Sequence, residues 1–312
     1  MSIIRTVHGD IPSDALGLTL LHEHILTLPP PSITDRTLEM SDETVMTAAV
    51  ANFARAGGSA IVEMTTRDYG RMPGGLKRIS EATGVHLVAV TGWIKQAGYT
   101  TWAQGRTVHD IADEMIRDVQ LGMPDSDGTP TTIRAGIIKA GSSLNTITAD
   151  ERNVLMAAAI AHAETGAAVS THTERGTMGV EQAQILIAGG VPPERILIGH
   201  CDHNLDWDYH VRLANLGVTL GYDQISKEKY APDNDRIAFI RRMIEASFTR
   251  QIALSMDLAR TVYFPEYGAW GTPGFSYMLW RFVPRLVEEG VDPALIETML
   301  IDTPRRLLTI AR

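Results

Sequence analysis

Several features that would assign a chain to a particular class are absent from this sequence. It contains one cysteine, Cys201, among 312 residues, so no disulfide can form within the chain. It has no basic run and a formal net charge of −9, which disfavours binding to nucleic acid or to an anionic membrane. No stretch approaches the roughly 18 apolar residues of a membrane span. The N-terminal segment lacks the basic and apolar regions of a signal peptide. We therefore expect a cytoplasmic protein.

What remains is an ordinary globular composition, with 44% hydrophobic and 21% charged residues. A chain of this length can bury a large core. Length alone would suggest two domains, but closed α/β barrels of this size commonly form one. We expect a single domain over residues 1–312.

Short apolar runs recur along the chain, each ending in polar residues or glycine before a longer amphipathic segment. Runs of this kind, rich in Val and Ile, predict strands that are buried on both faces. The predicted strands lie at residues 19–26, 60–66, 87–93, 134–141, 167–173, 196–201, 218–223 and 252–257.

The segments between these runs have helical patterns. Residues 41–58 begin with Ser41 as an N-cap candidate, and residues 148–166 begin with a capping box of Thr148 and Glu151. Strands alternating with helices predict the α/β class and a (β/α)₈ barrel. An open doubly wound sheet is the alternative, but no glycine-rich phosphate loop follows residue 26.

Polar side chains gather at the predicted C-terminal ends of the strands, where such barrels place their active sites. His22 and His24 lie two residues apart on the first strand, so they point to the same side. The other candidates are on the fourth, fifth, sixth and eighth strands: Lys139, His172, His200 and Asp257. Four histidines and an aspartate suit zinc, manganese or cobalt. The pattern therefore indicates a metal centre.

Each of these residues also has an ordinary explanation. A single buried histidine is usually a hydrogen-bonded core residue, Asp257 could cap a helix, and Cys201 is typical of a small buried hydrophobe. Lys139 is harder to explain, because an isolated ammonium inside a barrel costs on the order of several kcal/mol unless it is paired or neutralised. The ordinary explanations do not predict that all six candidates gather at strand ends.

Five motifs in this order resemble the phosphotriesterase family of the amidohydrolase superfamily: HEH, IK, THT, GHCD and SMD. The resemblance runs from about residue 16 to the C-terminus. It implies a binuclear metal centre, in which three residues hold the buried metal: His22, His24 and Asp257. His172 and His200 would hold the exposed metal. Lys139, carboxylated by CO₂, would bridge the two metals together with a hydroxide.

The resemblance also implies a mechanism. The metal-bridging hydroxide attacks the substrate, and the exposed metal polarises its carbonyl or phosphoryl oxygen. Asp257 would be the catalytic residue that orients the nucleophile and carries its proton to the leaving group. Asp202, beside His200, could accept a hydrogen bond from an imidazole, and a helix or loop cap explains it equally well.

The loops after the seventh and eighth predicted strands carry cations. Lys227 and Lys229 follow the seventh strand, and Arg260 and Tyr263 follow the eighth. Barrels often bind phosphate at these loops, although solvated loop charge is the alternative. The segments THTERGTMGVEQ, GHCDHNLDWDYH and KYAPDNDRIA resemble the branch that hydrolyses phosphorylated furanose lactones. This resemblance implies that Lys229, Arg260 and Tyr263 bind the substrate's phosphate.

The chain departs from that branch in places. It has His203 where the branch often has arginine, and a different segment, KAGSSLN, at Lys139. The third strand ends in TGWIKQAGY, with Trp93 in place of the tyrosine usual in acyl-homoserine lactonases. We predict a metal-dependent hydrolase that opens a lactone ring, with a phosphorylated sugar lactone as the favoured substrate. Contact of Lys227 and His203 with the substrate is left open.

Two other functions are compatible with these residues. A phosphotriesterase, a carboxylesterase or an acyl-homoserine lactonase would use the same metals on a neutral substrate, although Lys229 and Arg260 argue against it. A metal-free binding protein on the same barrel is the second possibility. We expect a small-molecule substrate, and a homodimer is possible.

Overall fold

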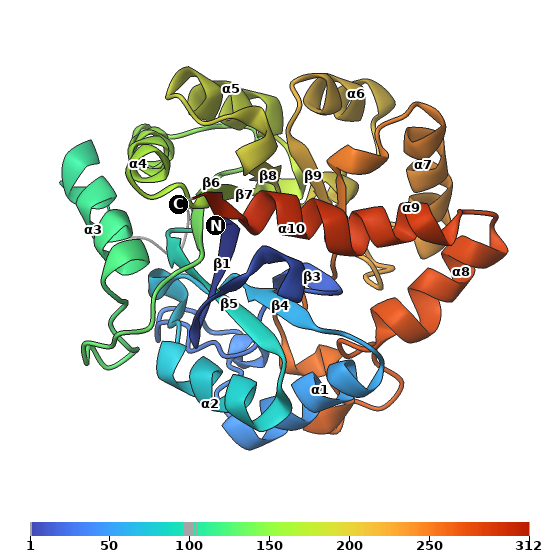
Figure 1. Cartoon of the computed structure of the whole chain (residues 1–312), viewed down its shortest axis with the longest axis horizontal. Coiled ribbons are helices and arrows are strands. Elements are labelled where there is room, and N and C mark those ends of the chain that lie inside the picture. Colours follow the sequence, from blue (N-terminus) through green and yellow to red (C-terminus); the bar gives the residue numbers. More distant parts are fainter. Residues whose placement is uncertain (1, 96–102, 104, 312) are drawn as a thin grey trace.

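The computed structural model describes residues 2–95, 103 and 105–311, and its centre is a ring of parallel strands surrounded by helices (Figure 1). Each strand pairs in parallel with the next one along the chain. They are β3 (Thr19–Glu23), β4 (Ala60–Glu63), β5 (His86–Gly92), β6 (Ile137–Ser142), β7 (Ala168–Thr173), β8 (Ile196–Ile198), β9 (Thr219–Tyr222) and β10 (Ile252–Leu254). All eight predicted strands are confirmed, and so is the (β/α)₈ barrel.

Hydrogen bonds connect β3, the first strand of the barrel, to the segment that follows β10, the last strand. The backbone N–H of Asp257 donates to the carbonyl of His22 at 3.0 Å. The hydroxyl of Ser255 lies 3.0 Å from the backbone nitrogen of His22, from which it accepts a hydrogen bond. The closure thus brings Asp257 directly beside the histidines at the end of β3.

Glu23, the middle residue of the HEH motif, also holds the segment that follows β10. Its buried carboxylate accepts hydrogen bonds from the backbone N–H groups of Met256 and Leu258 at 2.7 and 2.9 Å. It also accepts one from the Ser255 hydroxyl at 2.7 Å. The glutamate therefore points away from the two histidines and fixes the chain that carries Asp257.

The helices surround the strands in the order expected from the sequence. They are α1 (Glu43–Arg55), α2 (Pro73–Thr83), α3 (Val108–Gln120), α4 (Ala149–Thr165), α5 (Gly179–Ala188), α6 (Trp207–Asn215), α7 (Asp233–Glu245), α8 (Val283–Glu288), α9 (Pro293–Glu297) and α10 (Thr303–Leu308). The capping box of Thr148 and Glu151 is confirmed. The N-cap of α1 is Asp42 rather than Ser41, because the Asp42 carboxylate accepts from the N–H groups of Thr44 and Val45.

A small antiparallel sheet, which the sequence pattern did not reveal, covers the other end of the barrel. It consists of β1 (Ser2–Thr6), β2 (Gly9–Pro12) and β11 (Ile310–Ala311), with β1 in the middle. Ile4 of β1 packs against the apolar side chains inside the barrel, among them Leu21 and Val62. The two ends of the chain therefore lie side by side (Figure 1), at the N-terminal ends of the barrel strands.

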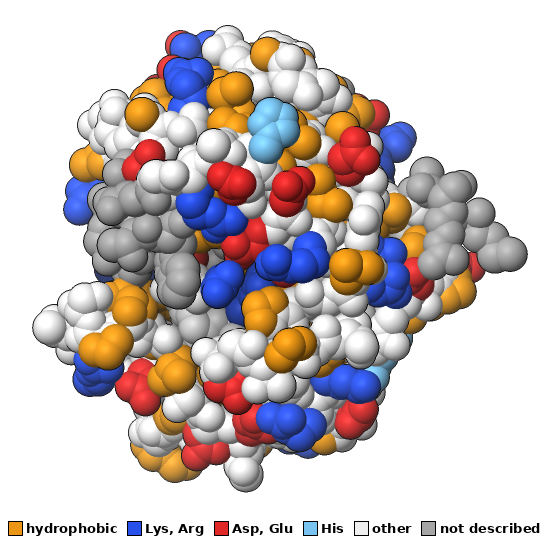
Figure 2. Space-filling view, turned by 90° about the vertical axis from the view of Figure 1, so that its left-hand side faces the viewer, with side chains coloured by type: hydrophobic (Ala, Val, Ile, Leu, Met, Phe, Trp, Pro, Cys, Tyr) orange, Lys and Arg blue, Asp and Glu red, His pale blue; other side chains and the backbone are white. Residues whose placement is uncertain are grey.

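The surface around α3 and α4 carries Lys and Arg side chains mixed with Asp and Glu side chains (Figure 2). In the part of the chain that the structure describes, no helix is long and apolar enough to cross a membrane. Cys201 is buried and its thiol donates to the carbonyl of Ile198 at 3.1 Å, as expected for a small core residue.

Replacing Glu23 with alanine should destabilise the fold. Two buried backbone N–H groups would lose their acceptor, and each such loss costs about 1–3 kcal/mol. We therefore expect the free energy of unfolding to fall by about 2–6 kcal/mol, measured by urea denaturation of metal-depleted protein. Glu245→Ala, on the exposed side of α7, is the matched control. Equal losses in the two variants would show that the segment after β10 holds without Glu23.

Candidate active site

The C-terminal ends of the barrel strands surround a cavity of about 200 Å³. Five of the six predicted metal ligands line this cavity: His22, His24, His172, His200 and Asp257. The sixth, Lys139 on β6, is 1% exposed. Its Nζ lies 3.0 Å from Nε2 of His22. The structure therefore brings all six residues together.

The candidate ligand atoms form two neighbouring groups. Nε2 of His24 lies 3.2 Å from Oδ1 of Asp257, and Nε2 of His22 lies 3.8 Å from the same oxygen. These three residues are close enough to hold one metal ion. In the second group, Nδ1 of His172 lies 2.9 Å from Nε2 of His200. The grouping is the one that the family resemblance implies.

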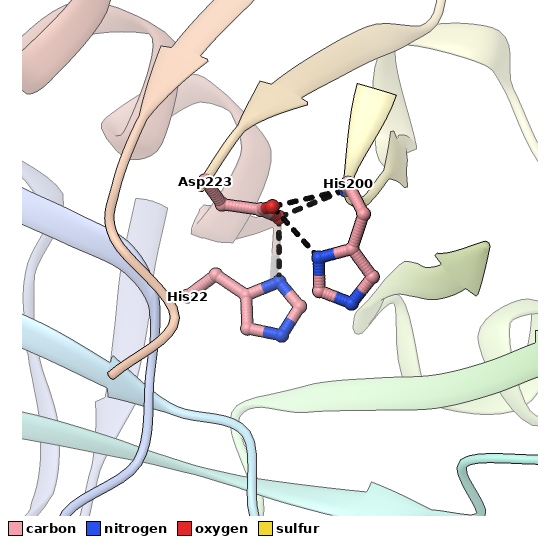
Figure 3. Close-up of side chains that lie close together, drawn as sticks. All are labelled: His22, His200 and Asp223. Carbon is pink, nitrogen blue, oxygen red and sulfur yellow. Dashed lines mark hydrogen bonds and ion pairs between the residues drawn. The ribbon is translucent and has the colours of Figure 1, made fainter. Parts of the chain in front are cut away.

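Asp223, which follows β9, connects the two groups (Figure 3). Its carboxylate lies 2.9 Å from Nδ1 of His22 and 2.7 Å from Nδ1 of His200. It also accepts the backbone N–H of His200 at 3.0 Å. These three side chains alone could hold a metal ion. However, an aspartate that accepts both Nδ1–H groups leaves both Nε2 lone pairs free for metal, so we assign Asp223 as a hydrogen-bond acceptor.

Sequence analysis missed Asp223, although its position resembles that of the predicted ligands. It is the acidic residue at the end of the predicted seventh strand, in VTLGYD. The candidate acceptor Asp202 does not contact an imidazole through its carboxylate. That carboxylate accepts the backbone N–H groups of Asp223 and Gln224 at 3.1 and 3.0 Å and pairs with Arg236 at 2.8 Å. Asp202 is therefore a loop cap, which holds Asp223 in place.

The other two imidazoles have orienting partners of their own. Nδ1 of His24 lies 2.8 Å from the hydroxyl of Thr65, which in turn donates to the buried carboxylate of Glu63. Nε2 of His172 lies 3.4 Å from the carboxylate of Glu174. Each partner fixes one ring nitrogen and leaves the other available to a ligand.

The backbone is strained at two of the candidate ligands. His200 and Asp257 have φ angles of 58° and 48°, in the left-handed region that non-glycine residues seldom occupy. Such conformations cost on the order of 1–3 kcal/mol each and cluster at functional sites. His200 lies two residues beyond β8 and Asp257 three residues beyond β10, and both side chains line the cavity.

The electrostatics of the site suit a cluster of neutral imidazoles. Burial lowers the pKa of His22 and of His172 to about 3, so both rings are uncharged at neutral pH. Burial also lowers the pKa of Lys139 to about 8. Burial acts to raise the pKa of Asp257, but the charge of Lys227 and the hydrogen bond with His24 outweigh it and hold that pKa well below its usual value.

Lys227, whose contact with the substrate the sequence left open, lies inside the cavity. It is 6% exposed, and its Nζ lies 2.8 Å from Oδ2 of Asp257 and 2.9 Å from Oε1 of Gln224. The amide nitrogen of Gln224 lies 2.8 Å from the same Asp257 oxygen. One carboxylate oxygen of Asp257 therefore faces the histidines, while the other is held by Lys227 and Gln224.

The predicted phosphate-binding residues lie around the mouth of the cavity. Arg260 and Tyr263 line it, and the Arg260 guanidinium contacts the carboxylate of Asp35. Lys229 is exposed, and its Nζ lies 5.7 Å from the centre of the Tyr263 ring. Lys227 lies 5.5 Å from the same ring. The structure thus brings the predicted set together and adds Lys227 to it.

Two further positions singled out in the sequence differ in their surroundings. His203 lines the cavity, and within the described residues neither of its ring nitrogens has a hydrogen-bond partner. Trp93 is 2% exposed and lies outside the residues that line this cavity. Residues 96–99 of the same segment lie outside the described residues.

Comparison with known proteins indicates the same family over nearly the whole chain. A family model described as the phosphotriesterase family matches residues 2–308. A lactonase structure from Listeria monocytogenes is 34% identical, covers 100% of both chains and has a TM-score of 0.93. The structure of the Escherichia coli phosphotriesterase homology protein, which holds phosphate in its active site, is 32% identical, covers 95% of this chain and 99% of its own, and has a TM-score of 0.89. A phospho-furanose lactonase of Mycoplasmopsis agalactiae is 32% identical over 98% of this chain and 91% of its own.

The barrel and its histidine and aspartate groups define a hydrolase with residues that could bind metal. The chain belongs to the phosphotriesterase family. It is an enzyme that hydrolyses ester bonds. Lactones are cyclic esters, so they belong to the compounds that such an enzyme can hydrolyse.

Replacing Asp223 with alanine should weaken metal binding without removing a proposed ligand. His22 and His200 would lose the acceptor that fixes their rings, and such changes typically lower metal affinity about 10–100-fold. Competition with a chromophoric chelator measures the affinity. Asp208→Ala on the exposed side of α6 is the control. An affinity equal to that of the control would show that Asp223 does not orient the ligands.

Proposed function

We propose that this enzyme opens the ring of a phosphorylated sugar lactone and that it uses two divalent metal ions. The observation that carries the proposal is the position of the two donor groups and three further residues in one cavity: Lys227, Arg260 and Tyr263. Four imidazoles, each with one ring nitrogen held by an orienting partner, and one carboxylate fit zinc best, and manganese or cobalt would also suit them.

The donor groups divide the proposed ligands between the two ions. His22, His24 and Asp257 would hold the buried ion, and His172 and His200 would hold the exposed one. Carboxylated Lys139 would be a ligand of both ions. A neutral amine is the form that reacts with CO₂, and the lowered pKa of Lys139 makes this form available. The resulting carbamate is an anion, which removes the cost of a buried ammonium.

The metal ions, when bound, supply an activated water molecule and polarise the ester carbonyl. Asp257 would take the proton of the attacking water, because its carboxylate lies beside the two histidines of β3. The same carboxyl group would return that proton to the leaving ring oxygen. Lys227 and Gln224 hold Oδ2, and so they keep the carboxylate in one orientation during this transfer.

The substrate's anionic group would bind at the loops after β9 and β10. Arg260 and Tyr263 lie on the cavity wall, with Lys229 beside the Tyr263 ring. A carbonyl held at the donor groups would leave the far end of a small lactone within reach of these residues. The E. coli relative holds phosphate in its active site, which supports an active site that accepts an anion.

A second candidate function is the hydrolysis of an uncharged lactone, carboxylic ester or phosphotriester. One observation favours it: the two best placed cations already have carboxylate partners. Arg260 contacts Asp35, and Lys227 pairs with Asp257. If both pairs persist in the complex, these two cations offer less positive charge to an anion.

The metal centre can be tested through Lys139. The purified wild-type enzyme should contain close to two divalent metal ions per chain by elemental analysis. Lys139→Ala should lower the metal content and reduce kcat by orders of magnitude, because the shared ligand is lost. A small added carboxylic acid should restore part of the activity by filling the space. Normal metal content and rate in Lys139→Ala would rule out a shared lysine ligand.

The anion site can be tested through Arg260. A charge-assisted hydrogen bond is worth roughly 1.5–3 kcal/mol, so Arg260→Ala should lower kcat/KM about ten- to a hundredfold. The loss should fall on a phosphorylated lactone and spare its unphosphorylated analogue. Arg241→Ala, on the far side of α7, is the control and should affect neither substrate. Equal losses on both substrates would indicate a structural role, and a wild-type preference for neutral esters would favour the second candidate.

A further inference from the structure

His172 is held differently from the other three candidate histidines. His22, His24 and His200 have their orienting partners in the buried interior, where Asp223 follows β9 and Thr65 lies just beyond β4. The partner of His172 is Glu174, two residues further along the chain, in the turn Glu174–Gly176. Glu174 is partly exposed at the cavity wall, so the orientation of the His172 ring depends on surface loops.

Lys95, three residues beyond β5, forms an ion pair with Glu174. The carboxylate of Glu174 lies 3.4 Å from Nε2 of His172, so it is placed to accept the Nε2–H of the imidazole. A ring that donates from Nε2 leaves the lone pair of Nδ1 free, and Nδ1 is the atom 2.9 Å from Nε2 of His200.

The backbone of His172 is fixed separately from its ring. The side-chain amide of Gln182 on α5 donates to the carbonyl of His172 at 2.8 Å. It also lies 2.6 Å from the hydroxyl of Ser142 on β6. Loss of the Glu174 carboxylate would therefore leave the strand end in place and free the ring alone.

We propose that Glu174, braced by Lys95, is a positioning residue that selects the ring orientation and tautomer of His172 for the exposed metal ion. The inference rests on the proposed binuclear centre. Glu174 approaches the ring at Nε2, whereas His200 lies on the Nδ1 side. A ligand role for Glu174 at the same ion is therefore disfavoured, because its bond to the ring would have to break.

The arrangement predicts two metal ions of unequal affinity. The buried ion has ligands fixed by Asp223 and by the pair of Thr65 and Glu63, and it should be insensitive to Glu174. The exposed ion should respond to any change that frees the His172 ring. Removal of an orienting partner typically costs about 10–100-fold in metal affinity.

The test is a titration of the metal-depleted full chain with zinc, followed by calorimetry and by elemental analysis at limiting zinc. We expect Glu174→Ala to weaken the second binding event about 10–100-fold and to leave the first unchanged. Glu174→Gln keeps an oxygen that can accept the Nε2–H, so it should restore part of the affinity. Lys95→Met should show a smaller loss in the same event. Glu181→Ala, an exposed acid on α5, is the matched control.

The outcomes separate this inference from the proposed function. If the wild type binds fewer than two zinc ions, the binuclear proposal itself fails. If it binds two and Glu174→Ala matches Glu181→Ala, the positioning role is wrong. Equal weakening of both events, or a lower midpoint of unfolding in the metal-free protein, would mean that Glu174 supports the fold instead. Should Glu174→Ala not fold, the same comparison is made with Glu174→Gln and Lys95→Met.

Discussion

The shared carboxylate of Asp223 is the interaction on which the site depends most. One buried acidic group accepts Nδ1–H from His22 on β3 and from His200, which lies in the segment after β8. This sets the tautomer of both rings at once and turns both free nitrogens toward the same space. The carboxylate is in turn held through the backbone by Asp202, whose charge is balanced by the buried guanidinium of Arg236. The interior of the barrel thus contains a chain of polar contacts that ends at the ligands.

The fold could be predicted from the sequence because parallel strands covered on both faces must be apolar throughout. This produces the continuous runs that mark β3 to β10, and the capping box of Thr148 and Glu151 marks the start of α4. The small sheet of β1, β2 and β11 was not predicted. Its strands are short, and β11 consists of two residues, so no periodicity distinguishes them from loop. Its burial arises from contacts such as that of Ile4 with the barrel interior, which connect residues far apart in sequence.

The candidate ligands could be predicted because the ends of parallel strands converge, so that polar residues there must meet. Their partners could not. Whether an acidic residue faces an imidazole or a backbone amide depends on small rotations at the strand ends, as Asp223 and Asp202 show. The pairing of Arg260 with Asp35 is similar, because it joins loops at opposite ends of the chain. Sequence analysis identified Arg260 as a cation near the site but could not show that a carboxylate already contacts it.

The antiparallel pairing of β1 with β11 has a mechanical consequence. Ser2 pairs with Ala311 and Ile3 with Ile310, so the two ends of the chain leave this small sheet at the same corner. A force that pulls residues 2 and 311 apart would load these pairs one after another, as in opening a zipper, instead of shearing them together. The first part of the molecule to yield would then be the cover at the N-terminal ends of the barrel strands. The cavity at the opposite end would lie outside the path of the force until Ile4 was withdrawn from the barrel interior.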